Sequence, residues 1–290
     1  MGKKLTYAES NRRFGAMLTV PAVLYLLLAM LIPILWAVMR SMQDKWGDFI
    51  GVEAYVRSLK DPVFYMAIFN TFAFAFCAVV GKTIMGMITA LVLNENFRLR
   101  FAARSFMLLP WAIPGTIAVL TWRWMFSDVG GSLNYLLKMT GLIQKDILWL
   151  SSSSAFWAIV MIDIWRGTPF MGLSILSGLQ SISHDLYEAA MVDGANTLQR
   201  FRFITLPQIK YVVLSAATMT TIWTLNAFET TWLLTRGGPG HITELISTYS
   251  YKTGFMSMDI GKSLAITVLT LPLFMLLVNF VTKYTLEGDQ

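Results

Sequence analysis

Charged and amide side chains stand inside otherwise apolar stretches of this chain. Asp163 and Arg166 lie three residues apart in one such stretch, and Glu229 stands in another. Charges inside a membrane segment are expensive, and they usually pair with one another or line a polar pathway. Two interpretations stay open for Asp163 and Arg166. They form a structural pair on one helix face, because residues at i and i+3 are neighbours, or they line a cavity for a polar solute.

A candidate cavity follows if these side chains converge at one depth. Trp165 and Trp223 offer flat rings that can stack on sugar rings, although tryptophans also pack between helices or lie at membrane interfaces. The predicted cavity residues are Asn70, Asp163, Trp165, Arg166, Trp223, Asn226 and Glu229.

Other chemistry is poorly supported. Gly81-Lys82-Thr83 matches only the end of a phosphate-binding loop, which also needs glycine at position 76, where this chain has Phe76. The chain has a single cysteine, Cys77, and no HExxH or GxSxG motif. We therefore expect no catalytic residue, no metal site, no cofactor bound by this chain and no ATP hydrolysis by it. We expect Lys82 to face an inner vestibule or a partner subunit.

The composition indicates an all-α membrane protein. Of 290 residues, 56% are hydrophobic and 14% are charged, and the mean hydropathy is +0.58. Soluble domains carry about 25% charged residues, so a soluble fold and a disordered chain are both excluded. The net charge of +6 is explained by cytoplasmic loops rich in lysine and arginine. No clustered basic face indicates a nucleic-acid partner.

Six apolar stretches are long enough to cross a bilayer, which takes roughly 20 residues per helix. Open membrane segments must be helical, because each backbone amide needs a partner inside the segment. The first stretch is free of charge for 26 residues, longer than the apolar core of about 7–15 residues in a signal peptide, so we expect it to remain as a span. The predicted spans are 14–39, 63–93, 105–126, 155–179, 211–234 and 263–282.

The loop charges predict the orientation. Eleven lysines and arginines lie in segments 1–13, 94–104, 180–210 and 283–290, against eight in the segments on the other side. The positive-inside rule then places both termini in the cytoplasm. The predicted organisation is a cytoplasmic tail at 1–13, a six-span domain at 14–285 and a cytoplasmic tail at 286–290.

The longest predicted cytoplasmic loop, 182–210, reads as a helix, a turn and a second helix. Asp185 and Glu188 are spaced as in a capping box, which predicts a helix beginning one residue after Asp185. Gly194 suits the left-handed residue that follows a helix end. Thr197 is a candidate cap for the second helix, and Pro207 marks where that helix stops or bends into the fifth span.

The same loop carries a specific resemblance. Glu188-Ala189-Ala190, Gly194 and Ile204-x-Leu206-Pro207 match, at every spacing, the EAA signature of permeases from binding-protein-dependent ABC importers. A second stretch resembles the first permease of carbohydrate-type importers, the group that includes maltose, glycerol-3-phosphate and lactose transporters. Its residues are Asn226, Phe228, Trp232, Leu234, Thr235, Gly237, Gly238, Pro239 and Thr243.

This resemblance implies a type I ABC importer transmembrane domain in a bacterial or archaeal cytoplasmic (inner) membrane. It implies a second homologous permease, a homodimeric ATP-binding subunit that holds ATP and Mg, and an extracytoplasmic solute-binding protein as partners. Loop 182–210 would hold the coupling helix that docks on the ATPase. The implied coupling residues are Glu188, Ala189, Ala190, Asp193, Gly194, Leu206 and Pro207. Gly237-Gly238-Pro239 would form a turn that faces the binding protein or shapes the outer gate.

Alternatives remain at this point. His184 stands where the family usually has proline, and Leu198 where tryptophan is frequent. The substrate is a sugar or sugar derivative, or else a phosphorylated or acidic solute such as glycerol-3-phosphate or an acidic oligosaccharide. A secondary transporter would show an internal repeat with broken helices at matching positions, and we see no such repeat. A membrane enzyme lacks a catalytic constellation.

Overall fold

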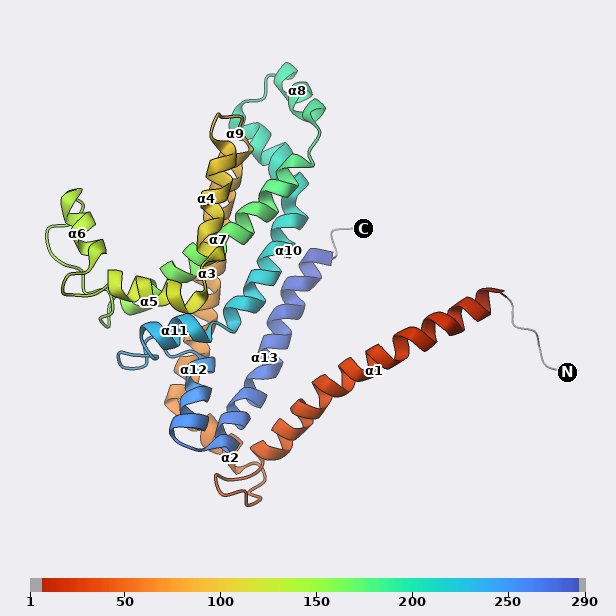
Figure 1. The fold of residues 1–290 in the computed structure, drawn as a ribbon, viewed down its shortest axis with the longest axis vertical. Helices are drawn as coiled ribbons and strands as arrows, with labels where there is room; N and C mark the ends of the chain where they lie inside the picture. Colours follow the sequence, from red (N-terminus) through yellow and green to blue (C-terminus); the bar gives the residue numbers. More distant parts are fainter. Residues whose placement is uncertain (1–6, 287–290) are drawn as a thin grey trace.

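The computed structural model describes residues 7–286, and the regular elements in that range are helices (Figure 1). The all-α prediction is confirmed. The longer helices are α1 (Tyr7–Ser41), α3 (Pro62–Asn94), α4 (Arg100–Ala112), α5 (Gly115–Met125), α7 (Ala155–Gln180), α10 (Leu206–Leu225) and α13 (Ile260–Leu286). The shorter ones are α2 (Glu53–Leu59), α6 (Ser132–Met139), α8 (His184–Val192), α9 (Thr197–Arg200), α11 (Phe228–Leu234) and α12 (Ile246–Tyr251), with π-helical turns η1 (Phe201–Thr205) and η2 (Lys252–Met256).

Four helices in the described range are long and apolar enough to cross a membrane: α1, α3, α7 and α13. Each contains one of the predicted spans 14–39, 63–93, 155–179 and 263–282. A fifth candidate is the pair α4 and α5, which meet at an angle of 93°. The predicted span 105–126 therefore corresponds to a bent helix pair. Ile113 is extended because it precedes Pro114, and the residue before a proline disfavours helical geometry.

The predicted fifth span, 211–234, is also interrupted. Helix α10 ends at Leu225, two non-helical residues follow, and α11 begins at Phe228. Asn226 has φ −100° and ψ 21°, and its side-chain amide donates to the carbonyl of Ile222 at 3.1 Å. An asparagine bonded to its own backbone competes with helix continuation.

Helix α10 is rich in threonine, and it is not among the helices of the described chain that are apolar enough to count as spans. Its threonine hydroxyls donate to backbone carbonyls one turn earlier, as Thr220 does to Ala216 and Thr224 to Thr220. These hydroxyls are therefore satisfied within the helix, and the polar composition does not prevent α10 from lying in an apolar environment.

The core of the bundle is the packing of α3 against α7 and α10. Small residues allow the backbones to approach closely, as is usual between membrane helices. A Cβ added to Gly86 of α3 would lie 2.5 Å from Cγ of Met171 in α7 and 3.0 Å from the backbone nitrogen of Gly172. Met171, Ile175 and Ile209 are fully buried in the cluster beside this contact.

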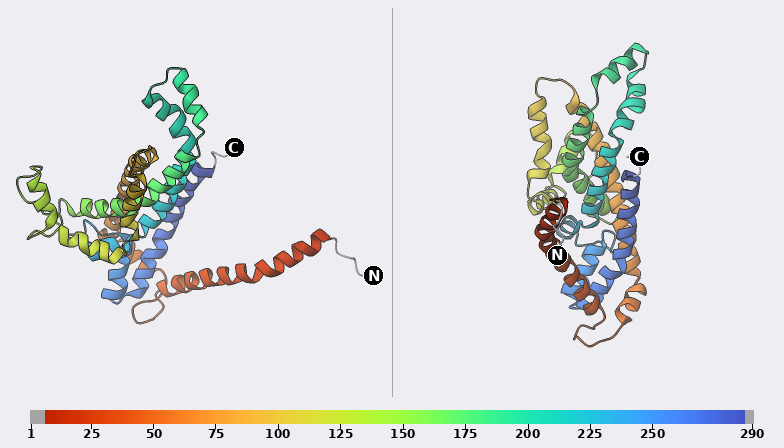
Figure 2. Two further views of the ribbon diagram at one scale, coloured as in Figure 1. Left: turned by 45° about the horizontal axis from the view of Figure 1, so that its top comes forward. Right: turned by 90° about the vertical axis from the view of Figure 1, so that its right-hand side faces the viewer.

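The bundle has two distinct ends and two projections. Helix α8 lies at one end, and α2 and α12 lie at the other (Figures 1 and 2). The segment α5–α6 extends sideways, and α1 leaves the bundle as an isolated helix. Every residue of α1 from 16 to 36 is exposed, and the helix meets α13 only near its own C-terminal end, where the carbonyl of Gln43 approaches Gly261.

Gly86→Val is expected to destabilise the bundle by about 1–3 kcal/mol, because added methyl groups would overpack the contact with α7. Thermal unfolding of the detergent-solubilised chain measures the effect. Gly15→Val is the matched control, since a Cβ there has no neighbour within 4 Å. Equal unfolding temperatures for the two variants would contradict the packing argument.

Candidate functional site

A pocket of about 240 Å³ lies where α7, α10 and α11 meet beside the break between α4 and α5. Five of the seven predicted cavity residues line it: Asp163, Arg166, Trp223, Asn226 and Glu229. The other lining residues are Lys82, Trp111, Gly167, Phe170, Thr224, Ala227 and Thr230.

The deepest polar contact of this pocket is an ion pair between α3 and α7. Nζ of Lys82 lies 2.5 Å from Oδ2 of Asp163, and the two side chains are 5% and 13% exposed. The same Nζ donates to Oγ1 of Thr224 at 2.8 Å, which adds α10 to the contact. Gly167 makes room for the lysine, since a Cβ there would lie 2.5 Å from its Cε.

The expectation for Lys82 is wrong. Lys82 is buried inside this chain, so it does not face a vestibule or a partner subunit. Of the two interpretations of Asp163 and Arg166, the mutual pair is contradicted, because Asp163 pairs with Lys82 and Arg166 with Glu229. Both residues line the pocket, as the other interpretation has it. Lys82 was itself the signal that could have predicted its pair with Asp163, because a charged residue in an apolar stretch needs a partner of opposite sign.

The second ion pair joins α7 to α11. Nη1 of Arg166 lies 3.5 Å from Oε2 of Glu229 on α11, with the side chains 29% and 42% exposed. Oγ1 of Thr116 on α5 donates to Oε1 of Glu229 at 2.6 Å. Gly115 permits this arrangement, because a Cβ there would lie 2.5 Å from Nη2 of Arg166. The pair is therefore looser and more open than the Lys82–Asp163 pair.

Aromatic rings complete the pocket wall. Trp223 is half exposed and packs against Phe170 with ring centroids 4.8 Å apart. Trp111 is also exposed on the pocket side of the α4 break. Trp165 lies outside the pocket and packs edge-on against Trp122 at 5.6 Å.

Asn70 also lies outside the pocket. Its amide donates to the backbone carbonyls of His241 and Glu244 at 3.0 and 3.2 Å. It thereby fixes the loop between α11 and α12 onto α3. The amide therefore stabilises the end of the bundle opposite α8 (Figure 1).

The loop between α11 and α12 contains Gly237-Gly238-Pro239, the motif predicted to form an outer turn. Gly237 has φ +80°, and a Cβ there would lie 2.6 Å from the carboxylate of Glu244. Glu244 is fully buried and pairs with Nζ of Lys252 at 2.5 Å and Nδ1 of His241 at 3.0 Å. The hydroxyl of Thr243 donates to the carbonyl of Gly238 at 2.7 Å. Glycine is required at 237, and Pro239 follows within the same turn.

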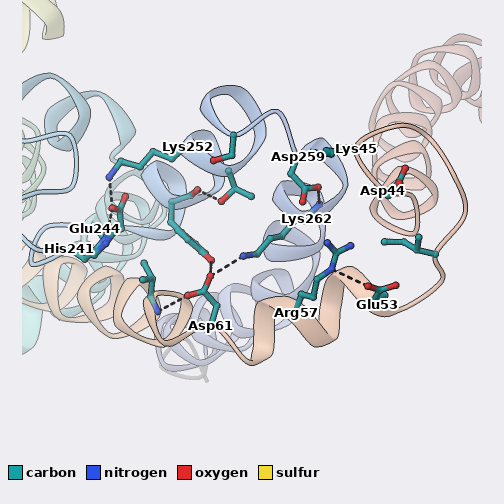
Figure 3. Close-up of a pocket in the computed structure, with 15 residues that line it drawn as sticks. Asp44, Lys45, Glu53, Arg57, Asp61, His241, Glu244, Lys252, Asp259 and Lys262 are labelled. Atoms are coloured by element: carbon teal, nitrogen blue, oxygen red, sulfur yellow. Dashed lines mark hydrogen bonds and ion pairs between the residues drawn. The ribbon is translucent and has the colours of Figure 1, made fainter.

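A larger cavity of about 770 Å³ opens at the end of the bundle opposite α8 (Figure 1), between the 44–61 region and the 241–262 region (Figure 3). Asp61 accepts from the hydroxyl of Tyr249 at 2.5 Å and from Nζ of Lys262 at 2.9 Å. Burial opposes ionisation of Asp61, but these hydrogen bonds outweigh it and hold its pKa below the ordinary value. The contact therefore contributes stability at neutral pH and loses it only as the pH falls through that depressed pKa.

The loop at the opposite end folds as a helix, a turn and a second helix, with caps that differ from those predicted. Ser183 caps α8 by accepting from the backbone nitrogen of Asp185, so Asp185 is not the cap. Asn196 caps α9 in a capping box with Gln199, and Thr197 is the first helical residue. A capping side chain must precede the helix by one position, and both predictions placed it too late.

Two other predictions for this loop concern its turn and its end. Gly194 has φ +78°, which confirms the left-handed turn. Pro207 does not stop a helix. It is the second residue of α10, directly after the π-helical turn η1, and the chain stays helical through it.

Helix α8 is held loosely. Within the described chain none of its residues is buried, and the hydroxyl of Tyr187 bonds to Oγ1 of Thr205 at 2.9 Å. Glu188 and Ala189 are exposed, as are Asp193 and Gly194. The helix therefore presents an open surface with small side chains.

Lys82→Met leaves Asp163 buried without its cation, and we expect a loss of about 3–5 kcal/mol in stability. The double variant Lys82→Met with Asp163→Leu should recover most of this loss, because no charge remains buried. Unfolding of the solubilised chain by detergent titration measures both. A single variant that costs less than about 1 kcal/mol would contradict the role of the pair.

Comparisons with known proteins agree with this architecture. Residues 82–285 match the family model described as binding-protein-dependent transport system inner membrane component. The trehalose/maltose transport system permease protein MalF of Thermococcus litoralis is 36% identical over 98% of this chain and 96% of its own length. The sulfoquinovosyl glycerol transport system permease protein SmoG of Agrobacterium fabrum is 34% identical over 91% of this chain and 88% of its own length.

A chain in the crystal structure of a bacterial ABC transporter involved in the import of the acidic polysaccharide alginate has the same fold. The match between the two chains has a TM-score of 0.82 at 24% identity, and it covers 95% of this chain and 96% of that one. The family model matches most of the chain, and both relatives are more than 30% identical to it. This chain belongs to the family of inner membrane components of binding-protein-dependent transport systems.

Proposed function

We propose that this chain is a permease subunit of an ABC importer for a sugar or a sugar derivative, and that the 240 Å³ pocket is its part of the translocation path. The observation that carries the proposal is the composition of this pocket. Ion-paired polar groups and the exposed ring of Trp223 line it at the breaks of two helices. Ligand pockets combine apolar walls with a few placed polar groups in this way.

The relatives support a sugar as the substrate. One is named for trehalose and maltose, and another for sulfoquinovosyl glycerol. Hydroxyl-rich solutes need both donors and acceptors, which Arg166 and Glu229 offer at the pocket wall. The alternative of a secondary transporter loses support from the family membership of the chain.

We further propose six crossings of the membrane. The four apolar helices, the bent pair α4–α5 and the threonine-rich α10 with α11 make six passes. An even number of passes places both termini on the side of α8, where lysine and arginine are more frequent. Loop 182–210 is then cytoplasmic, and the cavity of Figure 3 is extracytoplasmic.

Helix α8 is the proposed contact with the ATPase subunits, which would hold ATP and Mg. It protrudes from the end of the bundle, its surface is open, and its small residues permit close approach to a partner groove. The 780 Å³ space between α8 and the ends of α3 and α7 leaves room for it to shift.

Two other surfaces fit the remaining partners. Helix α1 exposes apolar side chains all round over 16–36, and a second permease together with lipid would cover them. The outer cavity is bordered by charges of both signs on loops fixed by Asn70, Asp61 and Glu244, which suits docking of a solute-binding protein. Gly237 leaves room for the carboxylate of Glu244, which lines this cavity, and Gly238 and Pro239 follow in the same turn.

Purification of the chain from its native membrane in mild detergent tests the assembly. We expect a second permease and an ATP-binding subunit to copurify, as identified by mass spectrometry. In proteoliposomes the complex should take up sugar only with ATP and the binding protein. Uptake by this chain alone would overturn the proposal in favour of secondary transport.

Gly194→Leu is expected to uncouple ATP hydrolysis from uptake, because leucine is strained at φ +78°. Gly194→Asn introduces a side chain of similar size that tolerates this conformation, so it should keep most of the coupling. The ratio of sugar imported to ATP hydrolysed measures the difference. Equal losses of coupling in both variants would mean that the size of the side chain at this turn matters and that the backbone conformation does not.

Trp223→Ala is expected to weaken transport by roughly 2- to 10-fold through KM, because the aromatic contact of about 0.5–1.5 kcal/mol is lost. Trp165→Ala is the matched control, since that ring packs on Trp122 outside the pocket. It should lower the unfolding temperature and leave KM unchanged. The reverse pattern would place the substrate elsewhere.

A further inference from the structure

The positive and negative side chains that line the 240 Å³ pocket are equal in number. Among the described residues that line it there are two cations and two anions, and each cation has an anion as its partner. The Lys82–Asp163 pair is buried and its lysine also bonds to Thr224, so it presents little charge to a solute. The field felt by a solute therefore depends on Arg166 and Glu229.

Glu229 is held where it offsets Arg166. Oε1 accepts from Thr116 at 2.6 Å, and Oε2 lies 3.5 Å from Nη1 of Arg166. An arginine without such a carboxylate is well suited to bind carboxylates and phosphates, because its planar fork matches their geometry. With the carboxylate beside it, an anionic solute meets repulsion from Glu229 as well as attraction to Arg166.

We propose that Glu229 makes this pocket selective for uncharged sugars over anionic ones. The inference rests on the proposed function and specifies its substrate class. A neutral sugar gains a donor from Arg166 and an acceptor from Glu229, and it disturbs neither ion pair. An anionic sugar must compete with Glu229 for Arg166, and like charges a few ångströms apart repel one another even near a protein surface. The alternative of a phosphorylated or acidic substrate is thereby disfavoured.

Two substitutions of opposite sign test the inference. Glu229→Gln keeps an oxygen that can accept from Thr116 and leaves Arg166 uncompensated. Arg166→Gln leaves Glu229 uncompensated. The double variant restores neutrality, and Asp128→Asn, on an exposed turn away from the pocket, is the control for a general change of charge.

The probes are methyl α-glucopyranoside and the matching methyl glucuronide, which differ only at C6, where a carboxylate replaces the hydroxymethyl group. Binding to the purified complex of both permeases and the ATPase subunits is measured by saturation-transfer NMR. The binding protein is omitted, because its own selectivity would hide that of the pocket. Melting temperatures establish that each variant is folded.

We expect the wild-type complex and the Asp128→Asn control to favour the glucoside. Glu229→Gln should move the ratio of the two affinities roughly tenfold or more toward the glucuronide. Arg166→Gln should move it in the opposite direction, and the double variant should return it close to the wild-type value.

A wild-type preference for the glucuronide, or a ratio that Glu229→Gln and Arg166→Gln leave unchanged, overturns the inference. If either variant fails to fold, the direction of the shift in the other decides. Sugar uptake by the complete transporter is measured in parallel. If sugar is taken up but the ratio of the two affinities does not change in the variants, only the role of Glu229 is refuted. If no sugar is taken up at all, the proposed function is refuted.

Discussion

The buried contact among Lys82, Asp163 and Thr224 is the interaction on which the rest of the bundle depends. It joins α3, α7 and α10 at one point, where small residues such as Gly167 bring the helices close enough for a lysine to reach. A buried charge without a partner is costly in any protein interior. The three helices are therefore fixed in one relative rotation, and that rotation brings Arg166 and Trp223 to the pocket.

The two helix breaks give the pocket its other wall. A continuous helix through Pro114 or Asn226 would carry Thr116 and Glu229 past the pocket, along the bundle axis. The 93° turn between α4 and α5 and the interruption before α11 bring these side chains together, where Thr116 and Arg166 both bind Glu229. The polar ends exposed by each break then border the cavity, which is where irregular backbone is tolerated inside a membrane.

The convergence of Asp163, Arg166, Asn226 and Glu229 was predictable from the sequence, but the position of Asn70 was wrong, and rotation about a helix axis was not predictable. Arg166 lies at the pocket, whereas its neighbour Trp165 faces Trp122, because adjacent residues on a helix point about 100° apart. The breaks were equally hard to predict. Pro114 interrupts a helix, yet Pro21 and Pro169 lie within continuous ones, so proline alone does not identify a break. The turn at Gly194 was predictable because it depends on one residue.

Loop 182–210 and the pocket lie at two ends of one continuous helix. From Thr197 the chain is helical without interruption through η1 and α10 to Leu225, and α11 with Glu229 follows after two residues. The hydroxyl of Tyr187 on α8 is hydrogen-bonded to Thr205, near the beginning of this continuous helix. Because a continuous helix transmits displacement along its length, a shift of α8 would reach the break at Asn226 before it could dissipate in a loop. Glu229 would then move relative to Arg166, so the Arg166–Glu229 contact is directly exposed to motion at the α8 end of the bundle.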